Sequence, residues 1–142
     1  MDRINRMNRI EEQPKGYDLC GQVIGAAMKV HSALGRGFLE SVYQNALIWE
    51  LRKNGLKAET QRPISVYYDG QLVGAFMADV LVDDSLIIEL KAIQALAKTH
   101  EVQLVNYLVA TGIDEGLVLN FGAERLEFKK KFRVPKSEPV SF

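Results

Sequence analysis

The sequence predicts an α+β fold in which helices pack on a mixed β-sheet. Apolar residues recur every three or four positions before residue 54 and again after residue 96, which is typical of amphipathic helices. Between residues 64 and 91 the apolar residues instead follow strand patterns, interrupted by two aspartate-rich turns. The predicted order is therefore two helices, three consecutive strands, one helix and two more strands.

The length and composition indicate one globular domain. The chain has 142 residues, of which 47% are hydrophobic and 25% charged, so disordered and collagen-like classes are excluded. We expect a flexible arm over residues 1–16, the domain over residues 17–134 and a tail over residues 135–142. Formal net charge is zero, so any basic surface must be local.

The compartment predicted from the sequence is the cytoplasm. The single cysteine, Cys20, cannot form an internal disulfide, and the N-terminus has no apolar signal region. No segment approaches the roughly 18 apolar residues of a membrane span. Cys20 and two histidines in separate segments also fit no zinc-ligand pattern.

Glycine-containing breaks delimit the predicted helices. The first covers residues 19–34 and ends at Gly35-Arg36-Gly37, and the second begins between Phe38 and Glu40 and ends at Asn54-Gly55. The third covers residues 96–110. The predicted strands cover residues 64–68, 72–82, 86–91, 117–121 and 126–132, with a hairpin turn at Asp69-Gly70.

The second hairpin carries the residues of chemical interest. In a three-residue turn centred on Asp84, Asp79 and Glu89 are each five positions from the centre and face each other. Lys91 shares the face of Glu89 because side chains alternate along a strand. Asp83 and Asp84 themselves are expected to be turn formers.

Two facing acids among apolar neighbours repel each other with little water to screen them. A divalent cation such as Mg²⁺ or Mn²⁺ would relieve this repulsion, since such ions prefer carboxylate oxygens plus retained waters. Lys91 could then assist an attacking water or stabilise charge on a phosphate. The simpler alternative is that Lys91 neutralises one of the two acids at an exposed edge.

The third predicted helix and the last strand hold further candidates. His100, Gln103 and Tyr107 form one polar stripe, whereas the valines at positions 102, 105 and 109 and Leu108 are expected around the other side. The stripe is either a solvated face or part of the site. Lys129 and Lys130 belong to a basic run that is either a solvated strand end or a phosphate contact.

Taken together, these motifs resemble a known family. Asp79 followed after a hairpin by Glu89-Leu90-Lys91 resembles the metal-binding motif of the PD-(D/E)XK nuclease superfamily, with Ala78 in place of its proline. The segment from Gly37 to Tyr43 reads G-x-x-E-x-x-Y. With the segment from His100 to Leu108 it is similar to the small GxxExxY proteins placed in that superfamily.

The resemblance implies a restriction-endonuclease-like core, a mixed β-sheet flanked by helices. It implies site roles for Glu40 as the helix acid, Asp79 and Glu89 as metal ligands, Lys91 as the catalytic lysine and Gln103 as a supporting group. The Leu90 carbonyl is expected to join the metal ligands. Independently of any site, an acid at position 40 would stabilise the start of its helix.

The predicted function is a Mg²⁺- or Mn²⁺-dependent nuclease that hydrolyses phosphodiester bonds of nucleic acid, DNA rather than RNA. Substrate contacts are expected from Tyr107, His100, Lys129 and Lys130. A homodimer would allow both strands of a duplex to be cut. The alternative is a catalytically silent nuclease-like module that binds nucleic acid or protein.

Overall fold

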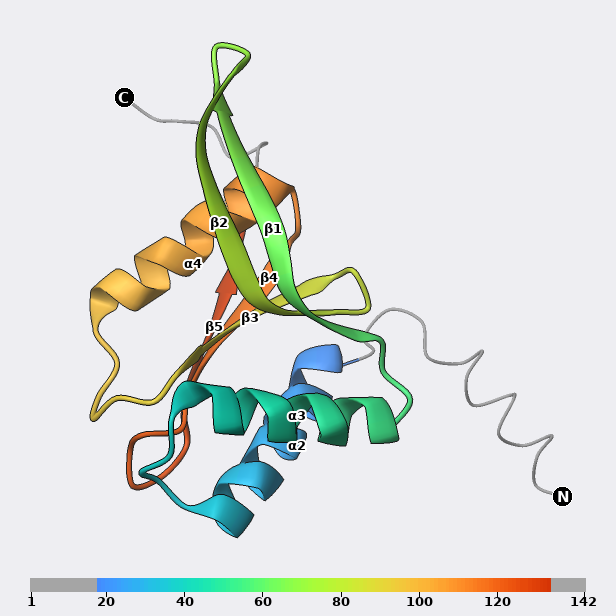
Figure 1. Cartoon of the computed structure of the whole chain (residues 1–142), viewed down its shortest axis with the longest axis vertical. Coiled ribbons are helices and arrows are strands. Elements are labelled where there is room, and N and C mark those ends of the chain that lie inside the picture. The colour runs from blue at the N-terminus through green and yellow to red at the C-terminus, as the bar shows by residue number, and fades with distance from the viewer. Residues whose placement is uncertain (1–17, 134–142) are drawn as a thin grey trace, which may run out of the picture.

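The computed structural model describes residues 18–133, which form a five-stranded mixed sheet with helices on both faces (Figure 1). The arm and tail expected at residues 1–16 and 135–142 lie outside the described residues. No helix within 18–133 is long and apolar enough to cross a membrane. The helices are α2 (Leu19–Leu34), α3 (Glu40–Lys53) and α4 (Lys98–Thr111), and the strands are β1 (Ala58–Tyr68), β2 (Gln71–Val82), β3 (Leu86–Lys91), β4 (Glu115–Asn120) and β5 (Glu127–Phe132).

The strands lie in sequence order across the sheet, from β1 at one edge to β5 at the other. All neighbours are antiparallel except β3 and β4, which are parallel because α4 crosses over between them. The mixed sheet predicted from the sequence is therefore confirmed.

Each face of the sheet has its own apolar core. Helices α2 and α3 cover one face, where their side chains pack on Val80, Ile88 and Leu117. Helix α4 covers the other face, where Leu104 and Leu108 pack on Ile87 and other apolar strand residues. Along β3 and β4, successive residues therefore point alternately toward α2 and α3 or toward α4, which decides which face each polar side chain of these strands occupies.

The segment that joins α2 to α3 is held by Tyr43. Its hydroxyl donates to the Gly35 carbonyl at 2.6 Å and accepts from the Phe38 amide at 3.2 Å, and its ring stacks on Phe121 with centroids 4.8 Å apart. Gly37 has φ of 116°, a conformation that L side chains rarely adopt. The glycine and tyrosine of the G-x-x-E-x-x-Y motif thus stabilise the backbone conformation of the segment before α3.

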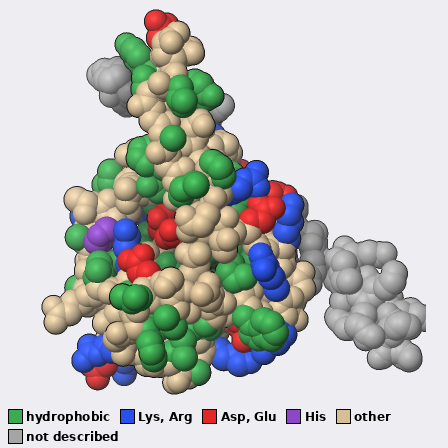
Figure 2. Space-filling view, viewed as in Figure 1, with side chains coloured by type: hydrophobic (Ala, Val, Ile, Leu, Met, Phe, Trp, Pro, Cys, Tyr) green, Lys and Arg blue, Asp and Glu red, His purple; other side chains and the backbone are tan. Residues whose placement is uncertain are grey.

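The β1–β2 hairpin projects from the body of the molecule as an arm (Figure 1). Its tip is the predicted Asp69-Gly70 turn, where both residues have positive φ. Figure 2 shows hydrophobic side chains along the arm. Those more than half exposed there are Tyr67, Tyr68, Leu72, Val73 and Met77.

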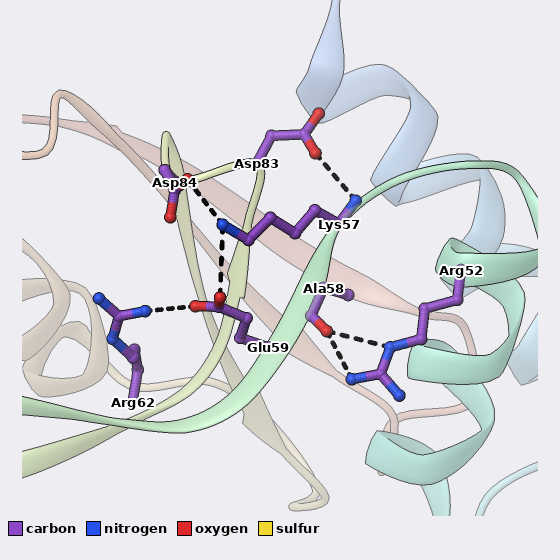
Figure 3. A network of polar contacts seen from close by, with 7 residues as sticks. All are labelled: Arg52, Lys57, Ala58, Glu59, Arg62, Asp83 and Asp84. Carbon is purple, nitrogen blue, oxygen red and sulfur yellow. Dashed lines mark hydrogen bonds and ion pairs between the residues drawn. The ribbon is translucent and has the colours of Figure 1, made fainter.

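Ion pairs and hydrogen bonds join the turn of the β2–β3 hairpin to the start of β1 (Figure 3). The Lys57 amide donates to Asp83 at 2.9 Å, and the Lys57 ammonium donates to Asp84 at 3.0 Å. Both aspartates have positive φ, in agreement with their expected role as turn formers. Arg52 donates twice to the Ala58 carbonyl and so joins the end of α3 to the start of β1.

Candidate active site

The two acids of the β2–β3 hairpin lie on the face covered by α4. The pairs Val82–Leu86 and Val80–Ile88 follow the predicted register, in which Asp79 and Glu89 come next, and the charge of Asp79 acts on Glu89. Leu81 and Ile87, which share the alternation of the acids, pack in the α4 core. Oδ2 of Asp79 accepts a hydrogen bond from the Leu90 amide at 2.8 Å, which fixes the Asp79 side chain across the hairpin.

Glu89 is an unusual buried acid. Only 7% of the residue is exposed, and its Oε2 has no hydrogen-bond partner among the described residues. Burial, together with the charge of Asp79, raises the pKa of Glu89 to about 8, against the opposing effect of Lys91. A buried carboxylate oxygen without a donor is costly unless a proton or a cation reaches it.

These two carboxylates fit a divalent cation. Carboxylate oxygens are hard ligands, and Mg²⁺ is commonly held by one or two of them while it keeps several waters. Across residues 18–133 no group of three or more His, Cys, Asp or Glu side chains is arranged to hold a metal ion. The donor set that the structure assembles is therefore the Asp79–Glu89 pair, with backbone or water oxygens to complete it.

Lys91 and Tyr107 border the acid pair. Lys91 is half-buried at the end of β3, and its charge acts on Glu89. Tyr107 is 7% exposed; burial, and then the charges of Glu89 and Asp79, raise the pKa of its phenol. The structure thus brings together four of the residues that the sequence predicts for the site.

Helix α4 places Gln103 beside Tyr107, and both line a cavity of ≈ 940 Å³ between α4 and the arm. The expectation that valines 102 and 109 lie on the far side of the helix from the polar stripe is wrong, because both line this cavity too. They are 51% and 57% exposed, whereas Leu104, Tyr107 and Leu108 face the sheet. The predicted polar stripe does not form one solvent-facing side of α4, because Tyr107 is buried with Leu104 and Leu108.

His100 has a structural contact that the sequence analysis did not anticipate. Its Nδ1 accepts from the Ala97 backbone amide at 2.9 Å, at the start of α4. An unpaired amide of the first helical turn is satisfied in this way. A substrate contact from His100 stays a prediction and would have to come from its other ring nitrogen.

Glu40 is the first residue of α3 and is exposed. Among the described residues, no hydrogen bond or ion pair links its side chain to another residue, and it does not form a three-ligand metal group with Asp79 and Glu89. Its position suits the stabilisation of the helix start, as expected for an acid there. Its role in the site stays a prediction.

Lys129 and Lys130 lie on opposite faces of the sheet. Lys129 pairs with Val118, which belongs to the α4 core, and Lys130 pairs with Leu117, which packs under α2 and α3. Consistently, Lys129 acts electrostatically on Glu101 of α4, and Lys130 acts on Cys20 of α2. Of the two predicted phosphate contacts, Lys129 is the one on the face of the acid pair.

A polar network behind the site was missed by the sequence analysis. Asn120 is fully buried; its carbonyl oxygen accepts from the amides of Ile93 and Gly122 at 2.9 and 3.0 Å. Its amide donates at 2.8 Å to Glu127, which also accepts from the Leu96 amide. The network anchors the segment between Lys91 and α4. An asparagine inside the apolar run 117–121 was the signal that could have revealed it, since buried amides require partners.

Comparison with known proteins gives a family and a likeness to solved structures. The family model described as the PD-(D/E)XK nuclease superfamily matches residues 17–132. A chain solved in the "Crystal structure of SSO0001" superposes with a TM-score of 0.54 at 18% identity, covering 66% of this chain. This chain spans half the length of that one, and the likeness concerns the fold alone. A search of curated proteins finds no match.

The family match covers most of the chain, including both acids, Lys91 and α4. Nucleases of this superfamily typically use divalent metal ions and act on nucleic acid. The mixed sheet with flanking helices agrees with a restriction-endonuclease-like fold. The chain belongs to the PD-(D/E)XK nuclease superfamily.

Proposed function

We propose that this protein is a Mg²⁺- or Mn²⁺-dependent nuclease that hydrolyses phosphodiester bonds of nucleic acid, with DNA as the preferred substrate. The observation that supports it most is the orphaned, buried Oε2 of Glu89 beside the Asp79 carboxylate. A purely structural acid pair would be expected to have donors for all its buried oxygens. A bound cation supplies the missing partner.

In this proposal Asp79, Glu89 and the Leu90 carbonyl hold the ion. When bound, the ion acts as a Lewis acid that polarises the phosphate and lowers the pKa of water. Asp79 is held in place by the Leu90 amide, so its remaining oxygen is oriented before any ligand arrives. The Leu90 amide thus contributes to the site as well as the hairpin register.

Lys91, Gln103 and Glu40 complete the proposed machinery. The Lys91 ammonium, next to the acid pair, orients the attacking water and stabilises negative charge that develops on the phosphate. Gln103, exposed in the cavity beside Tyr107, donates to a phosphate or water. Glu40, at the exposed start of α3, is the proposed group that is least supported by contacts.

The direct test is cleavage of supercoiled plasmid and of single-stranded DNA and RNA by the purified full chain with Mn²⁺ or Mg²⁺. Asp79→Ala and Lys91→Ala should each lower the rate by at least ~100-fold, the range expected for loss of a group that stabilises the transition state. Glu124→Ala, which removes an exposed loop acid, is the matched control and should cleave normally. Cleavage that persists in Asp79→Ala would refute these roles.

A catalytically silent binding module is the second candidate. It is supported by the small number of acidic ligands, because within residues 18–133 no third His, Cys, Asp or Glu side chain joins Asp79 and Glu89 in a group that could hold a metal ion. This candidate predicts Mn²⁺ binding without cleavage of any tested substrate. Measured turnover above that of Asp79→Ala would exclude it.

A further inference from the structure

A groove runs between the projecting arm and α4, with Tyr67 and Phe76 on the arm side and Tyr107 and Gln103 on the helix side. We propose that this arm groove binds unpaired bases, so that the substrate class is single-stranded nucleic acid. The substrate assignment rests on the proposed nuclease function, whereas binding in the groove can be measured without turnover. The groove volume of ≈ 940 Å³ lies within the range of small-molecule sites.

The groove has the side chains that bases stack on. Phe76 and Tyr107 lie with ring centroids 5.3 Å apart, and Phe76 remains 43% exposed. Tyr67, on the opposite strand of the arm, is 64% exposed. Aromatic faces of this kind bind unpaired bases with little sequence preference. Duplex DNA keeps its base faces buried in its own stack and cannot use them.

Polar groups in the same groove match the edges of bases. Gln103 and Asn106 are exposed on α4 and line the groove beside the aromatic rings. Each amide offers both a donor and an acceptor, as the Watson–Crick edge of an unpaired base does. An apolar peptide segment would leave these amides without partners.

A basic residue, Lys98, lines the groove near the start of α4. Lys98, Lys129 and Lys131 each act electrostatically on Glu101 in the first turn of that helix. Lys131 is paired with Glu101 at 3.0 Å, which leaves the charges of the other two lysines unbalanced within this cluster. The resulting positive rim is complementary to phosphates, and an aromatic groove with a basic rim is the usual arrangement in single-strand binding.

Tyr107 links the groove to the acid pair, whose two carboxylates lie outside the groove lining. Tyr107 is both a wall of the groove and a neighbour of Asp79 and Glu89, whose charges act on its phenol. A strand with its bases in the groove would therefore carry its backbone next to the proposed metal site. Because Glu89 is only 7% exposed, a flexible strand can approach it more easily than a stiff duplex.

The test measures binding by fluorescence anisotropy with a fluorescein-labelled 12-nucleotide DNA, in EDTA to prevent cleavage. The full chain should bind the single strand at least tenfold more tightly than the same sequence as a duplex. Tyr67→Ser and Phe76→Ala should each weaken single-strand binding roughly tenfold, the middle of the range for loss of one stacking contact. Lys98→Ala should lower the salt slope by about 0.7.

Tyr68→Ser is the matched control, because Tyr68 is 74% exposed on the same arm but does not line the groove. It should bind within twofold of the unmodified chain. Equal affinity for duplex and single strand, equal loss in Tyr68→Ser and Tyr67→Ser, or no binding of the oligonucleotide would each overturn the proposal.

Failure of the proposed function gives a different result. Groove-dependent binding without cleavage under any metal would refute the nuclease and leave the single-strand site standing. Metal-dependent cleavage of duplex DNA at unchanged rate in Tyr67→Ser and Phe76→Ala would refute the groove and leave the nuclease standing.

Discussion

Glu89 shows how one buried side chain can indicate a ligand. Its neighbours in sequence are apolar, and β3 is buried along almost its whole length. When Glu89 is ionised, its charge is repelled by the neighbouring Asp79 carboxylate. When Glu89 is protonated, this repulsion is absent, but the side chain is a poor metal ligand. The raised pKa therefore records a preference of the metal-free protein for the protonated form, which binding of a cation would reverse.

This preference makes the stability of the metal-free protein pH-dependent. The pKa of Glu89 is about 8 when folded, against ~4.3 for an unfolded glutamate. Between these values the folded chain holds a proton that the unfolded chain has lost, so its free energy of unfolding falls as pH rises, on the order of 1 kcal/mol per pH unit. The contribution of the Glu89 proton to the free energy of unfolding is complete below pH ~4.3 and is lost above about pH 8.

Urea denaturation in EDTA between pH 5 and 9 should reveal this slope as a difference from Glu89→Gln, which lacks the titrating group. The variant should be the more stable of the two at pH 9. Glu124→Gln, an exposed loop substitution, should follow the unmodified chain at every pH. Parallel curves for Glu89→Gln and the unmodified chain would contradict the assignment.

At the scale of the elements, the connection between β3 and α4 fixes the site, because Lys91 precedes it and Gln103 follows it. Asn120 and Glu127 hold this connection through amides of residues 93 and 96, although they come from other strands. A Cβ at position 122 would collide with the backbone of Ile93, so Gly122 allows the close approach.

Asn120→Ala should lower the free energy of unfolding by about 2–4 kcal/mol, since it removes a fully buried amide and leaves the half-buried Ile93 and Gly122 amides without their acceptor. Urea denaturation at pH 7 measures this. Asn45→Ala, an exposed change within α3, should alter stability by no more than ~0.5 kcal/mol. A loss below ~1 kcal/mol for Asn120→Ala would show that water replaces the amide.

The register of the β2–β3 hairpin was predictable because its turn residues and the strand alternation are both local signals. The extent of β1 was not: it begins at Ala58, six residues before the predicted start at Ile64. Residues 59–63 include Glu59, Arg62 and Pro63 and show no apolar alternation. Apart from Gln61, which has a positive φ, these residues join the strand because they pair with β2, which is a tertiary effect.

At the scale of the molecule, the sheet divides the basic run of β5 between two faces. Alternation alone predicts that Lys129 and Lys130 point to opposite sides. The face that carries the site is set by the side of the sheet on which α4 crosses over. No local signal in the sequence predicts that side. The same holds for the arm groove, since its two walls are about 30 residues apart in the chain.

This division predicts unequal roles for the two lysines in nucleic-acid binding. Lys129→Ala should weaken binding of a labelled single strand severalfold and reduce its salt dependence, because Lys129 adds to the positive charge near α4. Lys130→Ala, an exposed lysine on the opposite face, should change neither. Anisotropy titrations at several salt concentrations distinguish the two, and equal effects would contradict the assignment of faces.

The central claim is that the Asp79–Glu89 pair holds a divalent cation, and Mn²⁺ titration calorimetry of the full chain at pH 7.5 tests it most directly. The account predicts saturable Mn²⁺ binding that is unchanged in Glu124→Gln and weakened by at least ~10-fold in Glu89→Gln, as for loss of an ion ligand. Equal Mn²⁺ affinity in folded Glu89→Gln and the unmodified chain, or no Mn²⁺ binding by either, would contradict it.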